Sequence, residues 1–231
     1  MMTNKINKID MRFYLIMSTV NRNLGDIKEL LELSESMLGR QCVQLAKRLK
    51  KESENSSEQE REFLGGWYAD DFIQLQEIFP RIQRYSLFTT VMSSAESDLY
   101  RICIAIQNLQ QTTKKFKKPG NNIIKGCIEY LEKCCGVDLS KIIYITEIDM
   151  YRRIRNCIVH SEGKNSDSKP FEVETYCQKK PTLSIDRYGY IVIEENFLQI
   201  AMHVITEFFK SLIVECRIKL TAQQRRQPDA D

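Results

Sequence analysis

The stretch RRIRNCIVHSEG at residues 152–163 decides both the fold and the chemistry expected of this 231-residue chain. Over residues 147–160 the apolar side chains recur near helical spacing, which predicts an amphipathic helix. Gly163 predicts the end of that helix, and the polar residues around it, 161–170, predict a loop. The stretch therefore lies at the C-terminal end of a predicted helix, beside a polar loop.

The sequence on both sides of this stretch predicts a mainly α-helical chain. A turn with Gly189 between two alternating apolar runs predicts a small β-hairpin over residues 182–193. The polar residues 221–231 predict a disordered tail. Apolar periodicity predicts further helices over residues 26–51, 62–80 and 81–111, and a strongly apolar last helix over 195–220. The segment 123–140 predicts a short helix that ends at Gly136, a favourable C-cap residue.

The ends of the first helices follow from local signals. Asp26 is a candidate N-cap, and Glu29 three residues later completes a capping-box pattern. Residues 50–60 contain no apolar side chain and predict a loop. Pro80 predicts the end of the second helix, because proline lacks the N–H group that a helix interior needs.

The charge and histidine counts exclude several classes of function. With 34 basic and 31 acidic residues the net charge is +3, which excludes a polybasic protein that coats nucleic acid and an acidic solvating chain. The two histidines, His160 and His203, exclude a histidine-rich metal site and a mechanism that needs several histidines within one chain. His203 lies on an apolar stripe, which predicts a place in the core or in an interface.

The cysteines and the apolar runs indicate the compartment. The eight cysteines form no CxxC pair and lie mostly among apolar residues, which is typical of reduced, buried thiols. The first residues lack an apolar core followed by a cleavage site, and no apolar run approaches the roughly 20 residues that span a bilayer. We therefore expect a soluble cytoplasmic protein without membrane contact.

Arg155, Asn156 and His160 carry the chemistry of the central stretch. Asn156 and His160 are four residues apart and project from one helical face, while Arg155 lies about 140° around the helix from His160. Histidine exchanges protons near neutral pH, arginine binds phosphate oxygens with two N–H groups, and an amide can orient either. These groups suit phosphodiester cleavage by a ribose 2′-OH and require no metal or cofactor. Two copies of the helix in a symmetric dimer would supply two histidines.

A basic segment upstream is a second candidate for RNA contact. Lys114, Lys115, Lys117 and Lys118 surround Phe116, whose ring could stack on a base while the lysines bind phosphates. The simpler alternative is a solvated basic loop.

The segment RNCIVH, residues 155–160, resembles the R-x4-6-H signature of the HEPN superfamily, with the polar residue that its members favour after the arginine. The order of elements agrees, since a helix with a polar Glu96 precedes the motif and a hairpin and an apolar helix follow it. The resemblance implies a HEPN-like helical bundle over residues 81–220. The helical region 1–80 lies outside it and has no assigned role.

The resemblance implies a metal-independent endoribonuclease that leaves a 2′,3′-cyclic phosphate and dimerises around the motif helix. By this resemblance Arg155 and His160 are expected to be catalytic, Asn156 to be a positioning residue, and Glu96 to support the site. The implied role is a toxin or antiviral defence effector, with an antitoxin or another defence protein as a possible partner. Members silenced by AMPylation carry a tyrosine two residues after the histidine, and Glu162 stands there, so this regulation is not expected.

Three alternatives remain open from the sequence. The fold could serve as a non-catalytic module that binds RNA, a nucleotide or a protein. The acidic N-terminal helices could make the chain a helical adaptor. In the plainest case His160 caps its helix and Arg155 pairs with an acidic neighbour.

Overall fold

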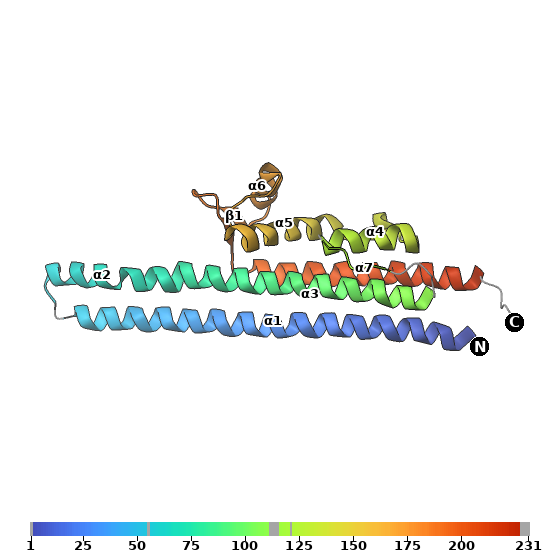
Figure 1. Cartoon of the computed structure of the whole chain (residues 1–231). Coiled ribbons are helices and arrows are strands. Elements are labelled where there is room, and N and C mark those ends of the chain that lie inside the picture. Colours follow the sequence, from blue (N-terminus) through green and yellow to red (C-terminus); the bar gives the residue numbers. More distant parts are fainter. Residues whose placement is uncertain (1, 55, 111–115, 121, 227–231) are drawn as a thin grey trace.

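The computed structural model of the protein describes residues 2–54, 56–110, 116–120 and 122–226. It confirms a mainly helical chain with a small antiparallel hairpin before the last helix (Figure 1). The hairpin pairs β1 (Leu183–Ile185) with β2 (Ile191–Ile193). The alternation of apolar side chains around Gly189 thus predicts the two strands correctly.

Three long helices form the body of the molecule. They are α1 (Met2–Ser53), α3 (Phe79–Gln110) and α7 (Phe197–Arg226), and each packs against the other two. The N-terminal half of α1 lies in the same hydrophobic core as α3 and α7, with Phe13 and Leu31 fully buried. Residues 1–80 and 81–220 therefore share one core.

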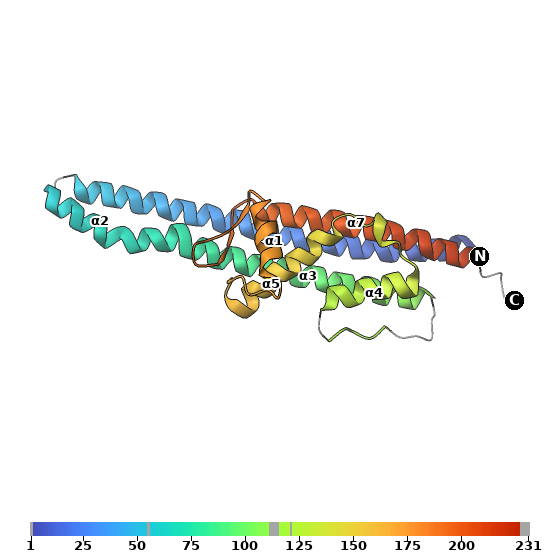
Figure 2. The same cartoon turned by 90° about the horizontal axis from the view of Figure 1, so that it is seen from above.

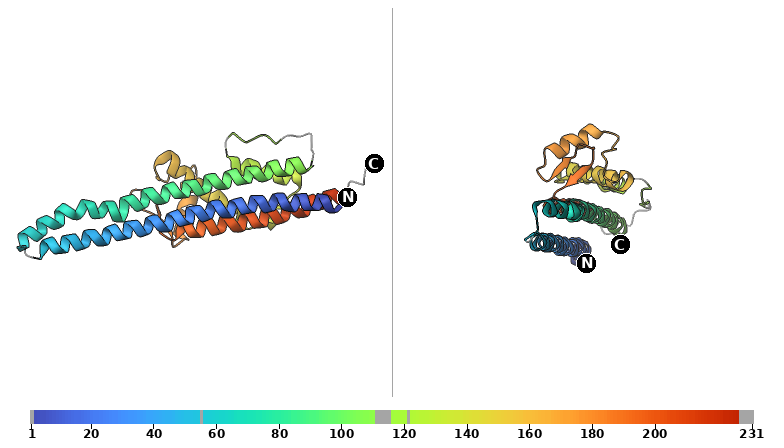
Figure 3. Two further views of the ribbon diagram at one scale, coloured as in Figure 1. Left: turned by 90° about the horizontal axis from the view of Figure 1, so that it is seen from below. Right: turned by 90° about the vertical axis from the view of Figure 1, so that its left-hand side faces the viewer.

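The shorter helices cover the face of α3 and α7 that lies opposite α1 (Figures 1 and 3). They are α4 (Ile123–Cys135) and α5 (Ile145–Ser161), joined through a 3₁₀ turn at Leu139–Lys141, and α6 (Pro170–Gln178), which packs on α5 and β1. Helix α6 is not among the helices that the periodicity predicts, because its nine residues are too few for a clear pattern. An aromatic cluster of Phe88, Tyr151 and Phe197 joins α3, α5 and α7, with ring centroids 5.3–5.9 Å apart.

The predicted end of a helix at Pro80 is wrong. Helix α2 (Glu58–Ile73) runs through a π-helical turn at Gln74–Ile78 directly into α3, and the backbone stays right-handed helical throughout. Proline removes one N–H group and collides with the carbonyl four residues earlier. A π-helical turn just before it relieves both problems by shifting the hydrogen bonds by one residue.

The predicted N-cap at Asp26 is also wrong, because α1 continues through it. The apolar face that carries Leu24, Ile27 and Leu31 stays buried on both sides of Asp26, so packing extends the helix. A capping box exists at the start of α2, where Ser57 and Glu60 exchange hydrogen bonds.

The distal half of α1 and the whole of α2 form an antiparallel helical hairpin that extends past the start of α7 (Figures 1 and 2). We call residues 32–53 and 58–78 the distal hairpin. Tyr68 is its only buried residue in the part of the chain that the structure describes. The Tyr68 hydroxyl donates a hydrogen bond of 2.8 Å to the carboxylate of Glu52, which links the two helices of the hairpin.

The last helix is longer than predicted. It stays helical to Arg226, within the tail predicted as disordered, and residues 227–231 lie outside the described part. By length and composition α7 is apolar enough to cross a membrane, with a mean hydropathy of 1.4. However, 56% of its apolar stretch is buried inside the protein.

Candidate active site

The motif residues lie on the last turns of α5, and the end of this helix is fixed by the hairpin. Gly163, with φ of +91°, follows the helix and donates its N–H to the carbonyl of Cys157 at 3.0 Å. The carbonyl of Gly163 accepts a hydrogen bond from the N–H of Ile191 at 2.9 Å. The predicted stop at Gly163 is therefore confirmed, and β2 holds the turn that follows His160.

Tyr85 of α3 packs against this turn from the other side. Its hydroxyl donates a hydrogen bond to the carbonyl of Ile191, and its ring lies so close to Gly163 that a β-carbon there would collide with it. Burial raises the pKa of Tyr85 to about 12, so the hydroxyl keeps its proton. The sequence does not reveal Tyr85, because the residues that it joins are 78 and 106 positions away.

Arg155 is half-buried between α5 and α3. Its Nη2 lies 3.6 Å from Oε2 of Glu96, and its Nη1 donates to Oδ1 of Asn156 at 3.1 Å. The Arg155 side chain is 23% exposed and that of Glu96 is 13% exposed. The structure therefore brings together three of the four predicted site residues.

The Nε of Arg155 is buried and has no hydrogen-bond partner among the described residues. A buried N–H group of a guanidinium without a partner is costly, and such groups need an explanation. The two preceding arginines differ, because Arg152 binds Asp149 at 2.9 Å and Arg153 binds three carboxylates, those of Asp149, Asp167 and Glu172. Arg155 thus keeps one donor that its surroundings do not use.

His160 is exposed on the last turn of α5, one turn beyond Asn156. In the described residues no hydrogen bond joins it to Arg155. Since α5 stays α-helical to Ser161, His160 lies about 7.5 Å further along the axis than Arg155 and about 140° around it. Within one chain the two side chains therefore leave the helix in different directions. The other histidine, His203, is exposed on α7, so of its two predicted places the core is wrong and the interface stays a prediction.

The basic segment lies only partly within the described residues, since Lys114 and Lys115 fall outside them. The ring of Phe116 packs on Tyr130 and Tyr100, with centroids 4.5 and 5.6 Å away. Lys118 lies over the Tyr100 ring, and Lys117 is exposed. The ring that was a candidate for stacking on a base is thus half-buried among tyrosines.

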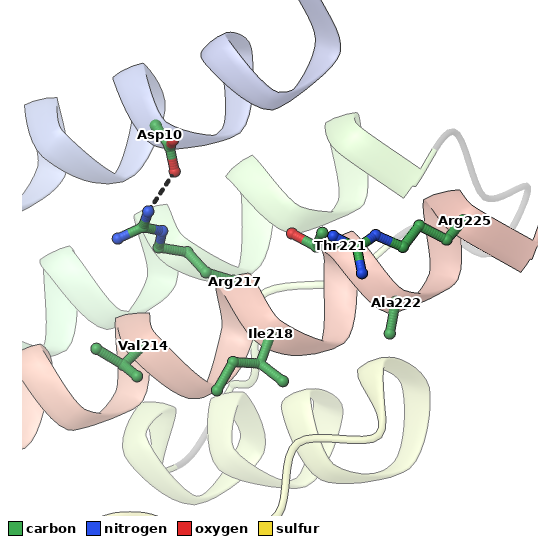
Figure 4. A pocket seen from close by; sticks show the side chains of 7 residues that line it. All are labelled: Asp10, Val214, Arg217, Ile218, Thr221, Ala222 and Arg225. Carbon is green, nitrogen blue, oxygen red and sulfur yellow. Dashed lines mark ion pairs between the residues drawn. The ribbon is translucent and has the colours of Figure 1, made fainter. Parts of the chain in front are cut away.

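Two hollows of the surface lie away from the motif. One, of about 460 Å³, lies between α1 and α7, and two of its lining residues, Asp10 and Arg217, form an ion pair of 2.7 Å. Figure 4 shows these lining side chains. Another of about 570 Å³ lies where the distal hairpin meets α7 and is lined by Glu35 and Arg84, among others. Neither of these two hollows is lined by a motif residue. Among the described residues no group of three or more histidine, cysteine or acidic side chains could hold a metal ion.

Searches against protein-family models, curated proteins and solved structures find no match to this chain. The resemblance to the HEPN superfamily thus rests on the motif and on the order of elements around it.

Proposed function

We propose that this chain is a metal-independent endoribonuclease of the HEPN type that acts as a toxin or antiviral defence effector. The observation that carries the proposal is the setting of Arg155. Its guanidinium is held by Glu96 and Asn156 while the side chain stays 23% exposed, and His160 is exposed on the last turn of the same helix. An oriented, partly exposed cation on the same helix as a proton-exchanging group suits binding and cleavage of a phosphodiester.

In the proposed reaction, a histidine takes the proton of the ribose 2′-OH, and the 2′-oxygen attacks the adjacent phosphorus. The bond from phosphorus to the 5′-oxygen breaks, and this leaving oxygen takes up a proton from a second histidine or from water. The products are a 2′,3′-cyclic phosphate and a 5′-hydroxyl. Arg155 stabilises the additional negative charge on the phosphate oxygens during attack.

A dimer formed through α5 would bring an arginine and a histidine to the same phosphate, which the divergent side chains of a single chain do not. Because Arg155 and His160 point about 140° apart on one helix, one phosphate is better served by Arg155 of one copy and His160 of the other. The exposed Val159 beside His160 would supply an apolar contact for such a dimer. A two-fold arrangement yields two equivalent composite sites.

The test is incubation of purified protein with total RNA in EDTA, followed by analysis of the new ends. We expect cyclic phosphate ends for the wild type, and a loss of at least about 100-fold for His160→Ala, in the range of general acid–base catalysis. Arg155→Lys keeps the positive charge but loses the bidentate hydrogen bonding of the guanidinium, so we expect a strong loss of cleavage activity in this variant as well.

The matched control is His203→Ala, since His203 is also an exposed histidine on a helix but lies outside the motif. It should cleave as the wild type does. Circular dichroism and melting curves show whether each variant is folded. Cleavage that persists unchanged in both motif variants would exclude the proposed site.

One observation favours the second candidate, a non-catalytic module that binds RNA, a nucleotide or a protein. The charge of Arg155 is already partly neutralised by Glu96, which weakens its pull on a phosphate. Such a module would bind its ligand without turnover. Filter binding and cleavage measured on the same RNA separate the two functions.

A further inference from the structure

The distal hairpin exposes large apolar side chains that no other described residue covers. Phe63 and Trp67 of α2 are 68% and 70% exposed, and their rings lie 6.2 Å apart. On α1, Val43 is 54% exposed. Adjacent exposed aromatic rings, and tryptophan above all, are typical of protein interaction sites.

The two helices of the distal hairpin carry opposite charge. Residues 40–51 contain five basic and no acidic side chains, whereas residues 58–77 contain six acidic and one basic. All of these side chains are exposed. Among the described residues, the only ion pair that any of them makes is between Arg48 and Glu52 of the same helix. Apart from Arg48, these charged side chains therefore make no ion pair with any described residue.

These residues form two stripes with the same spacing. Arg40, Val43, Lys47 and Lys50 recur at intervals of three and four on α1, and we call them the basic stripe. The acidic stripe on α2 has the same intervals, and consists of Glu60, Phe63, Trp67 and Asp70. Intervals of three and four place each set on one side of its helix, as in packed helix pairs. Each stripe has apolar and charged positions that the other complements.

We propose that the distal hairpin is a self-association surface, on which the basic stripe of one copy packs against the acidic stripe of a second copy. A two-fold axis brings both complementary pairs into contact at once, because each copy supplies one stripe of each kind. Lysines of the basic stripe then lie over the Trp67 ring, where a cation is favoured. This interface is separate from the α5 contact and does not depend on the proposed ribonuclease activity.

Two full-length variants test the proposal. One reverses the basic stripe with Arg40→Glu and Lys47→Glu, and the other reverses the acidic stripe with Glu60→Lys and Asp70→Lys. In sedimentation velocity each variant alone should self-associate at least 10-fold more weakly than the wild type, because like charges face one another. An equimolar mixture should recover association as a 1:1 complex, since the reversed stripes complement each other.

Recovery of association in the mixture would distinguish contact between two distal hairpins from changes within one hairpin and from contacts through α5. Repulsion inside one hairpin cannot be repaired by adding a second protein, and contacts through α5 are the same in every pairing. A mixture that associates no more tightly than the separate variants would overturn the proposal, as would a wild type whose association is insensitive to salt. Trp67→Ala should weaken association, whereas Phe171→Ala, at an exposed aromatic residue on α6, should leave it unchanged.

Discussion

Gly163→Ala tests how the end of the motif helix is held. An L-residue in a left-handed conformation costs roughly 1–2 kcal/mol, and Gly163 has φ of +91°. The new β-carbon would collide with the Tyr85 side chain, and overpacking of this kind costs roughly 1–3 kcal/mol. If Tyr85 moves away, its hydrogen bond to Ile191 is lost, at a further cost of about 1 kcal/mol. We expect the free energy of unfolding to fall by roughly 3–6 kcal/mol, the sum of these effects.

Urea unfolding followed by circular dichroism measures this loss, and two other glycines serve as controls. Gly136 has φ of +67° but open space around it, so Gly136→Ala should cost only about 1–2 kcal/mol. Gly39 lies inside α1 with open space around it, and Gly39→Ala should stabilise the protein by about 0.5–1 kcal/mol. If Gly163→Ala costs no more than Gly136→Ala, the close packing of Tyr85 on the turn is refuted.

Two further predictions concern buried charges. Arg84 donates to both carboxylate oxygens of Glu35, at 2.7 and 3.1 Å, and to the carbonyl of Ile193. Glu35→Gln should therefore lower the free energy of unfolding by about 2–3 kcal/mol, measured by urea titration. An unchanged free energy of unfolding would contradict a stabilising role of this ion pair. Burial raises the pKa of Asp98 above its ordinary value of 3.8, although Arg101 and Ser94 oppose the shift. A raised folded-state pKa means that the protonated form is favoured by folding. The stability of the wild type relative to Asp98→Asn should therefore be greatest below about pH 4 and fall as pH rises through the raised pKa; a difference that grows with pH would have the wrong sign.

Local signals predict those parts of the fold that local interactions determine. The helix over the motif, its stop at Gly163 and the hairpin around Gly189 follow from periodicity and from positive φ angles that glycine accepts. Pro80 and Asp26 mislead because longer-range packing and a π-helical turn outweigh their local preferences. The burial of apolar side chains along α1, α3 and α7 keeps these helices continuous.

The candidate site is only partly readable from the sequence. The spacing of Arg155, Asn156 and His160 is local, so the motif is visible in the chain itself. The contact between Glu96 and Arg155 spans two helices, and the support from Tyr85 spans a helix and a hairpin. Such contacts depend on the packing of distant segments. The opposite charges of residues 40–51 and 58–77 are visible in the sequence. That both segments lie exposed on one helical hairpin is seen only in the folded structure.

Subunit mixing tests the proposed composite ribonuclease site most directly. Arg155→Ala and His160→Ala should each be inactive toward RNA in EDTA. In an equimolar mixture half of the dimers are mixed, and each of these has one intact pairing of Arg155 with His160. The mixture should therefore recover about one quarter of the wild-type cleavage rate. A mixture that stays as inactive as its components, or single variants that cleave like the wild type, would contradict the account.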